Sequence, residues 1–156
     1  MTIILKNKET LICKEFYFKC CIGKNGLTKN KIEGDKKTPR GTYFLGNLFY
    51  RKDKNQKPIT KLKCIPISKK MGWCNDIKTQ HKYNKLIKIN KNIRYEKMFR
   101  SDFKYDFIIP IKYNMDKTQM GKGSAIFIHL TKNYKKTAGC IAVKQKDFLV
   151  MIKLLS

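Results

Sequence analysis

The sequence predicts a mainly β domain that ends in one helix. Short segments rich in Ile, Phe, Tyr, Thr and Cys alternate with turn signals over the first two-thirds of the chain. Clear helical spacing occurs only in 145–155, where Phe148, Ile152 and Leu155 share one side. With 156 residues, 42% of them apolar, and with no repeat or linker, residues 1–156 are expected to form a single domain with its own core.

The expected strands follow from these apolar segments. The segment 124–130, SAIFIHL, is the clearest buried strand, and Pro110 suggests that the strand at 105–113 lies at an edge or contains a bulge. A short helix is expected at 95–102. The other expected strands are 2–5, 9–23, 41–50 and 61–68, and turns are expected at 23–26, 33–41, 53–58 and 71–76.

The formal net charge of +25 makes an anionic partner the first interpretation. However, Lys outnumbers Arg by 32 to 4, and the lysines are scattered along the chain. Proteins that read nucleic acids favour Arg, which contacts bases and phosphates in a bidentate manner. The pattern therefore favours a solvated surface over a nucleic-acid site, and it is compatible with a polyanionic surrounding such as a cell wall.

The cysteines do not form a metal-binding pattern. Six are present without any Cys-x-x-Cys pair, and His81 and His129 lie far from any cysteine cluster. Most of them are expected to be small buried residues in a reducing compartment. The N-terminal segment places apolar residues before lysines, the reverse of a secretory signal, and no apolar run approaches the ~20 residues of a membrane helix.

Two segments combine into a candidate nucleophile site. The apolar strand in GKGSAIFIHL ends at His129, and the sequence TAGC places Cys140 eleven residues later, after a polar loop. A strand, a loop and a return would bring both side chains to the same end of a sheet. An imidazole there could take the proton of a thiol, which is a nucleophile only as thiolate. Gly139 allows a sharp turn whose backbone N–H groups, at Gly139 and Cys140, could point to an oxyanion. Taken singly, each residue is more typical of a surface His or a packed Cys.

Together the two segments resemble the signature of the L,D-transpeptidase catalytic domain, the YkuD family. That signature has a histidine at the end of an apolar strand, then a loop, then Ser/Thr-His-Gly-Cys, matched here by His129 and Thr137 to Cys140. The stretch 33–41, EGDKKTPRG, is similar to the family's Thr-Pro-x-Gly segment. A bacterial branch of the family is similar in three further places, and the similarity covers roughly 20–148. These places are MGWCND at 71–76, Tyr83-Asn84 and Tyr113-Asn114.

Two residues depart from the family pattern. Ala138 stands where well-studied members have a second histidine, and Ala142 stands where many have an arginine. An arginine would offer a partner for a substrate carboxylate, so its absence bears on recognition of the acyl donor. The loop between His129 and Cys140 is also short.

The resemblance implies a β-sandwich or flattened barrel with a few short helices and a C-terminal helix. It implies that Cys140 attacks the L,D-amide before the terminal D-alanine of a peptidoglycan stem peptide and that His129 carries the proton. The resulting thioester would pass to an amine, without a metal or other cofactor. The alternatives are an L,D-carboxypeptidase or peptidoglycan hydrolase with the same pair, and, from another class, a basic nucleic-acid-binding protein.

The resemblance also bears on partners and compartment. Peptidoglycan stem peptides are the implied substrate, and an anionic cell-wall polymer is a further possible partner. That substrate implies the periplasm or cell wall, whereas the sequence as written, without a visible signal, predicts the cytoplasm.

Other residues are weaker candidates. Substrate contacts are expected from Trp73, Tyr113, Asn114 and Thr137, although a core position is favoured for Trp73. Asp76 and Glu96 could form buried ion pairs or orient the site. His81 is expected in a solvated loop, and the turn at 38–41 is expected to be structural.

Overall fold

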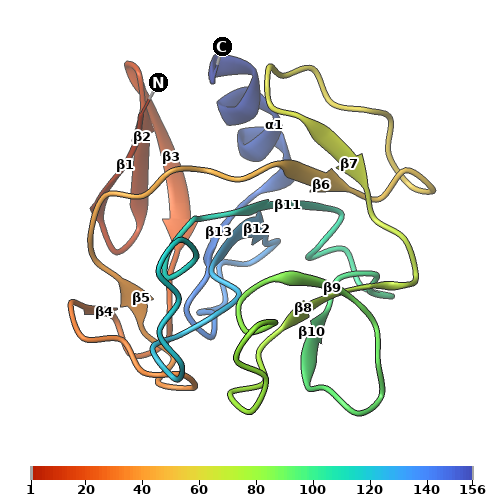
Figure 1. Cartoon of the computed structure of the whole chain (residues 1–156). Coiled ribbons are helices and arrows are strands. Elements are labelled where there is room, and N and C mark those ends of the chain that lie inside the picture. The colour runs from red at the N-terminus through yellow and green to blue at the C-terminus, as the bar shows by residue number, and fades with distance from the viewer. Residues whose placement is uncertain (1, 156) are drawn as a thin grey trace.

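The computed structural model describes residues 2–155, which form thirteen strands and one helix (Figure 1). The mainly β prediction is therefore confirmed, with a single helix in the described part. The strands are β1 Ile3–Asn7, β2 Thr10–Cys13, β3 Phe16–Cys21, β4 Leu27–Thr28, β5 Thr38–Pro39, β6 Leu48–Tyr50, β7 Cys64–Pro66, β8 Met71–Cys74, β9 Leu86–Lys88, β10 Tyr95–Lys97, β11 Phe107–Pro110, β12 Phe127–Leu130 and β13 Ile141–Val143, and the helix is α1 Gln145–Leu154.

Eight strands form the main sheet, in the order β1-β2-β3-β13-β12-β11-β6-β7. Helix α1 lies along this sheet, and its buried residues Phe148, Met151 and Ile152 join the large apolar core (Figure 1). A three-stranded sheet, β10-β8-β9, lies in the lower part of the view, and β4 pairs with β5 at its left side. No helix between residues 2 and 155 is both long and apolar enough to cross a membrane.

Strands β12 and β13 lie at the centre of the main sheet and run parallel, with His129 opposite Ala142. Because side chains alternate along a strand, each strand sends residues to both faces of the sheet. One face carries residues of the large core: Ile128, Leu130, Ile141 and Val143. On the other face, Phe127 and Cys140 join a second cluster with Trp73, Met98 and Tyr105.

Several boundaries differ from those expected. The segment 9–23 is a hairpin, because Lys14 adopts a φ of 55° between β2 and β3. The 124–130 strand begins only at Phe127, because Ala125 has a φ of 53° that interrupts the extended backbone. The helical tail is confirmed as α1.

Three local predictions are wrong. The expected turn at 71–76 contains strand β8, in which Gly72 makes room for the ring of Tyr95: a Cβ at Gly72 would lie 2.7 Å from it. The expected helix at 95–102 begins instead with β10, which pairs with β8. Pro110 is the last residue of β11, which is an interior strand, so the edge alternative is wrong. The bulge alternative agrees with a one-residue shift in register, from Ile108 opposite Phe49 to Ile111 opposite Leu45.

Candidate active site

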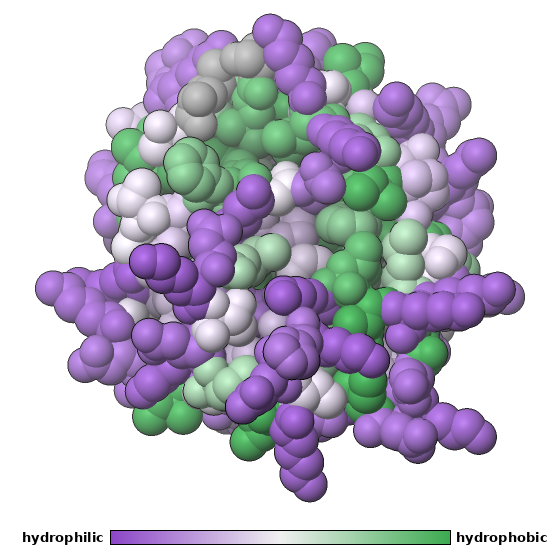
Figure 2. Space-filling model, in the orientation of Figure 1, coloured by the Kyte–Doolittle hydropathy of each residue, from purple (hydrophilic) through white to green (hydrophobic). Residues whose placement is uncertain are grey.

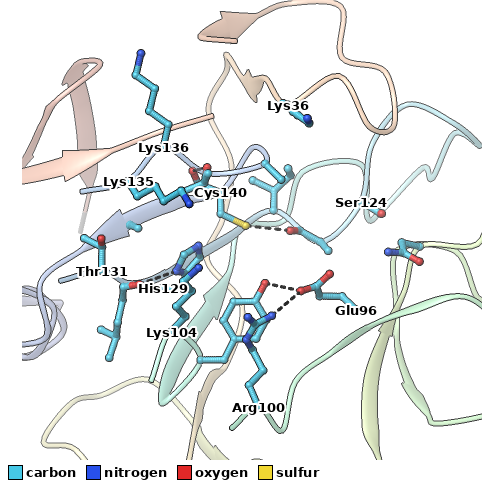
Figure 3. Close-up of a pocket in the computed structure, with 18 of the residues that line it drawn as sticks. Lys36, Glu96, Arg100, Lys104, Ser124, His129, Thr131, Lys135, Lys136 and Cys140 are labelled. Carbon is cyan, nitrogen blue, oxygen red and sulfur yellow. Dashed lines mark hydrogen bonds and ion pairs between the residues drawn. The ribbon is translucent and has the colours of Figure 1, made fainter. Parts of the chain in front are cut away.

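A cleft of about 660 Å³ opens on the face of β12 and β13 opposite α1, and both His129 and Cys140 line it (Figure 3). Its other walls come from the segment 96–105 and from the loops at 31–36 and 131–138. Lysines dominate the rim, where Lys36, Lys104 and Lys136 project around the cleft. The structure thus brings together the two residues that the sequence pattern singled out.

Cys140 follows the loop 131–139 and is 8% exposed. Its thiol donates to the carbonyl oxygen of Ala125 at 3.3 Å and accepts the N–H of Phe127 at 3.3 Å. Burial raises the pKa of Cys140 to about 12; the N–H of Phe127 and the charge of Lys31 act in the opposite direction, and Glu96 raises it further. The resting residue is therefore a thiol.

His129 lies in β12 and is also 8% exposed. Its Nδ1 lies 3.0 Å from the carbonyl oxygen of Leu130, which can only accept a hydrogen bond, so Nδ1 carries the proton and Nε2 is left as the acceptor. Burial lowers the pKa of His129 to about 4, and the charges of Lys104 and Arg100 add to this effect. The imidazole is neutral at physiological pH.

His129 and Cys140, which lies two residues before the partner of His129 in β13, both line the cleft, and Figure 3 shows the imidazole and the thiol in the same part of it. In the described part of the chain no hydrogen bond joins them, because the thiol is held by the backbone before and within β12. Burial favours the uncharged form of both groups, so the empty site holds a neutral pair. Proton transfer from sulfur to nitrogen would need a ligand that compensates the new charges.

A wall of three linked side chains faces this pair (Figure 3). The ring of Tyr105 packs edge-on against His129, with centroids 5.4 Å apart, and its hydroxyl donates to Glu96 at 2.9 Å. The guanidinium of Arg100 lies 3.6 Å from the same carboxylate and 4.9 Å from the Tyr105 ring centroid. Sequence reasoning named Glu96 alone, because the roles of Arg100 and Tyr105 depend on contacts that only the fold creates.

The turn before Cys140 is fixed by two threonines. Thr137 Oγ1 donates to the carbonyl of Cys140 at 2.6 Å and accepts the N–H of Gly139 at 3.1 Å. Thr38, expected only to be part of a turn, is buried in β5 and donates to the carbonyl of Gly139 at 2.7 Å. Gly139 has a φ of 140°, and a Cβ there would lie 2.9 Å from the carbonyl of Lys37, so a side chain does not fit.

These bonds bear on the expected oxyanion donors. The N–H of Gly139 already donates to Thr137, so it is not free in this conformation. Among residues 2–155 the N–H of Cys140 has no acceptor, which leaves it available to a ligand. Of the two predicted backbone donors, Cys140 is the one that this conformation offers.

Three of the expected substrate contacts lie behind the cleft, and Thr137 alone of the four lines it. The buried amide of Asn84 connects them: it accepts from the indole N–H of Trp73 at 3.0 Å and donates to the carbonyls of Tyr113 and Asn114 at 2.9 and 2.8 Å. Trp73, 4% exposed, packs edge-on against Phe127. Trp73, Tyr113 and Asn114 therefore do not line this cleft, and the amide of Asn84 holds them in a supporting layer. The core position favoured for Trp73 is confirmed, and a contact of these residues with substrate stays a prediction.

The same amide supports the Cys140 thiol indirectly. Asn84 also accepts the N–H of Ala125 at 3.0 Å, and the carbonyl of Ala125 accepts the thiol hydrogen bond. Asp76, by contrast, binds the backbone N–H groups of Lys78 and Arg94 and does not line the cleft, and His81 is exposed.

The two departures from the family signature both line the cleft. Ala142 is 1% exposed and lies opposite His129 in the neighbouring strand, while Ala138 is exposed in the loop. No cluster of three or more His, Cys, Asp or Glu side chains between residues 2 and 155 could hold a metal ion. All six cysteines are free.

Among models of protein families, that of the L,D-transpeptidase catalytic domain, YkuD, matches residues 1–156. Comparisons with curated proteins and with solved structures return no match. The matched family is one of enzymes that act on peptidoglycan, and the mainly β architecture with its C-terminal helix is consistent with it. The chain therefore belongs to the YkuD family of L,D-transpeptidase catalytic domains.

Proposed function

We propose that this chain is a cysteine acyltransferase that acts on peptidoglycan stem peptides, with Cys140 as nucleophile and His129 as general base. The observation that carries the proposal is the neighbouring position of the two groups in one cleft, with Nε2 of His129 left as the acceptor. The family match supplies the substrate class.

In the first step, Cys140 Sγ attacks the carbonyl carbon of the L,D-amide between the diamino acid and the terminal D-alanine. The thiol proton passes to Nε2 of His129, and the carbonyl oxygen becomes an oxyanion that the N–H of Cys140 can bind. When the tetrahedral intermediate collapses, the C–N bond breaks, His129 gives its proton to the leaving amine, and D-alanine departs. A thioester to Cys140 remains.

In the second step, the side-chain amine of another stem peptide attacks the thioester. His129 takes a proton from that amine, the C–S bond breaks, and the sulfur recovers a proton from the imidazolium. The products are a cross-linked peptide and free Cys140. Water in place of the amine would yield the shortened stem peptide by the same sequence of proton transfers.

The neutral resting pair suits this mechanism. Burial disfavours both a thiolate and an imidazolium in the empty cleft, so the charges form together with the bond to carbon. The carbonyl of Leu130 accepts a hydrogen bond from Nδ1–H and stabilises the imidazolium once it forms. Because oxidants react with the thiolate, a buried thiol with a raised pKa would resist oxidation until an acyl donor binds.

The test is intact-protein mass spectrometry after incubation with a carbapenem or with a disaccharide tetrapeptide. The native chain is expected to form one covalent adduct, and with the tetrapeptide the adduct accompanies the loss of D-alanine. Cys140→Ala should form none, whereas the matched variant Cys64→Ala, which removes a more accessible thiol, should react like the native chain. An adduct that persists in Cys140→Ala would refute the proposal.

The same incubation separates the two acceptors. With a second stem peptide in excess, a transferase accumulates the cross-linked dimer, and a carboxypeptidase accumulates the shortened tripeptide. His129→Gln should slow adduct formation by a factor of 10² to 10⁴, the usual contribution of a general base, given as an order of magnitude.

A further inference from the structure

Lys31 is a buried lysine in the wall of the cleft that the proposed steps do not use. It is 4% exposed, although a lysine is almost never fully buried unless its charge is paired. Its stem packs on Gly123, where a Cβ would lie 2.8 Å from Lys31 Cε, so any side chain at Gly123 would displace it. The absence of a side chain at Gly123 therefore leaves room for the Lys31 side chain.

The ammonium group of Lys31 is held in one place. It donates to Asp35 Oδ1 at 2.6 Å, and the same carboxylate accepts the backbone N–H groups of Ile32 and Lys37, each at 2.9 Å. Because the carboxylate is fixed by the backbone, the ammonium is fixed as well. The cation is thus preorganised rather than free to follow a ligand.

The ammonium lies beside the turn that carries Cys140. A Cβ on Gly139, the residue before Cys140, would lie only 3.6 Å from Lys31 Nζ. The charged and titratable groups that line the cleft near Cys140 come from four elements: Lys31 from the loop before β5, Glu96 from β10, Tyr105 from the segment before β11, and His129 from β12. Of these, the Lys31 charge lowers the pKa of Cys140 and the Glu96 charge raises it.

We propose that Lys31 stabilises the negative charge that forms at Cys140 and at the attacked carbonyl oxygen during acyl transfer. Gly139 cannot supply its N–H, since that group donates to Thr137, so a fixed cation complements the N–H of Cys140. A buried charge acts through a lower dielectric than the exposed lysines of the rim and is less screened by salt. The inference rests on the proposed role of Cys140 as nucleophile.

The test measures alkylation of Cys140 by iodoacetamide, a neutral reagent, as a function of pH, with peptide mapping to isolate this cysteine. Lys31→Met should slow alkylation about tenfold at each pH between about 7 and 9, where the thiolate of Cys140 is the minor species; this factor is the smaller end of the effect of a nearby opposite charge. Lys31→Arg should retain most of the rate. Lys29→Met removes an exposed lysine two residues away and should leave the profile unchanged.

A second variant separates this effect from simple bracing of the loop. Asp35→Asn removes the neutralising carboxylate charge, while the amide Oδ1 can still accept from Lys31 Nζ and from the N–H of Lys37 and so keep the ammonium in place. Alkylation should therefore be as fast as in the native chain or faster. If Lys31 only braced the loop, Asp35→Asn would slow alkylation as much as Lys31→Met does, and that outcome would overturn the proposal. An unchanged profile in Lys31→Met would also overturn it.

These outcomes differ from failure of the proposed function. If the native chain forms no adduct at Cys140 with a carbapenem or a stem peptide, the nucleophile assignment fails. If it forms the adduct and Lys31→Met reacts at the native rate, the nucleophile assignment stands and only the role of Lys31 is lost.

Discussion

The two faces of the β12–β13 pair share one backbone but differ in what burial does. On the core face, Ile128 and Val143 pack with residues of α1, and burial simply removes apolar surface from water. On the cleft face, burial surrounds the titratable groups of His129 and Cys140 and moves the pKa of each away from neutrality. The comparison shows that one alternating pattern can provide stability on one side and reactivity on the other.

The two faces also contribute differently to the free energy of unfolding. The core face gains stability from every buried carbon, about 25 cal/mol per Å². The cleft face keeps an imidazole that could be charged outside the protein but is held neutral inside, which makes folding less favourable at low pH. A mutation on the core face should therefore lower the free energy of unfolding and leave the reactivity of Cys140 unchanged. A mutation on the cleft face should lower the reactivity and change the free energy of unfolding little.

The largest expected effect on stability is on the core face. Phe148 in α1 is fully buried against Phe107, and Phe148→Ala should lower the free energy of unfolding by about 3–5 kcal/mol. The folded fraction should still alkylate Cys140 at the native rate, because no atom of Phe148 reaches the cleft. Guanidinium unfolding and iodoacetamide labelling measure the two properties.

Cys140→Ala provides the opposite case: no acylation and a small change in stability, since the thiol makes only two weak hydrogen bonds. A Phe148→Ala chain that is folded but has lost the reactivity of Cys140 would show that the two faces are not separable.

The next effect concerns pH. The pKa of His129 is about 4 in the folded state, against an ordinary value of 6.5. Between these values the unfolded chain binds a proton that the folded chain does not, so this contribution is complete above pH 6.5 and is lost as the pH falls toward 4. The loss reaches about 3 kcal/mol at most.

His129→Gln should remove this contribution. The difference in the free energy of unfolding between the native chain and His129→Gln, followed from pH 7 to pH 4, isolates it from the carboxylates. If the two chains lose stability in parallel over this range, the imidazole is not held neutral by burial.

A smaller effect is expected in the layer that supports the cleft. Asn84 adopts a φ of 57°, so Asn84→Gly keeps the backbone while it removes the amide. Four hydrogen bonds are lost and the stability should fall by about 2 kcal/mol. Acylation of Cys140 should also slow, because the carbonyl of Ala125 would lose its support. Trp73→Phe removes one of the four bonds and should cost about 0.5 kcal/mol, with near-native acylation. Native acylation by Asn84→Gly would show that the thiol does not depend on this layer.

The sequence predicts the parts of the site that are local and misses those that depend on distant contacts. His129 and Cys140 are joined by one strand-loop-strand unit, so their spacing and the apolar pattern suffice to bring them to one cleft. Thr38 is 101 residues from the Gly139 carbonyl that it binds, and nothing local to 38–41 indicates that bond. In the sequence Lys31 cannot be distinguished from the other lysines, and only the structure shows that it is buried.

The errors in the fold have a similar cause. The residues of 71–76 are typical of a turn, but Gly72 is required by the ring of Tyr95 from another strand. A short helix is expected at 95–102, yet the pairing of Tyr95–Lys97 with β8 makes its first three residues a strand. Tertiary contacts override local preference in both places.

The smallest expected effect is that of salt on the chemistry. Hydrophilic side chains project around the visible face of the molecule (Figure 2), and Lys132, Lys135 and Lys136 at the cleft rim are exposed. Salt screens exposed charges beyond about 8 Å at physiological ionic strength, so retention on an anionic cell-wall polymer should fall steeply with added salt. Acylation of Cys140 by a small neutral donor should hardly change, because His129 and Lys31 are buried.

The two measurements, made on the same protein over the same salt series, compare the rim with the cleft floor directly. If salt suppresses the small-donor rate as strongly as it suppresses retention, the exposed lysines take part in the chemistry, and the separation between rim and floor is wrong.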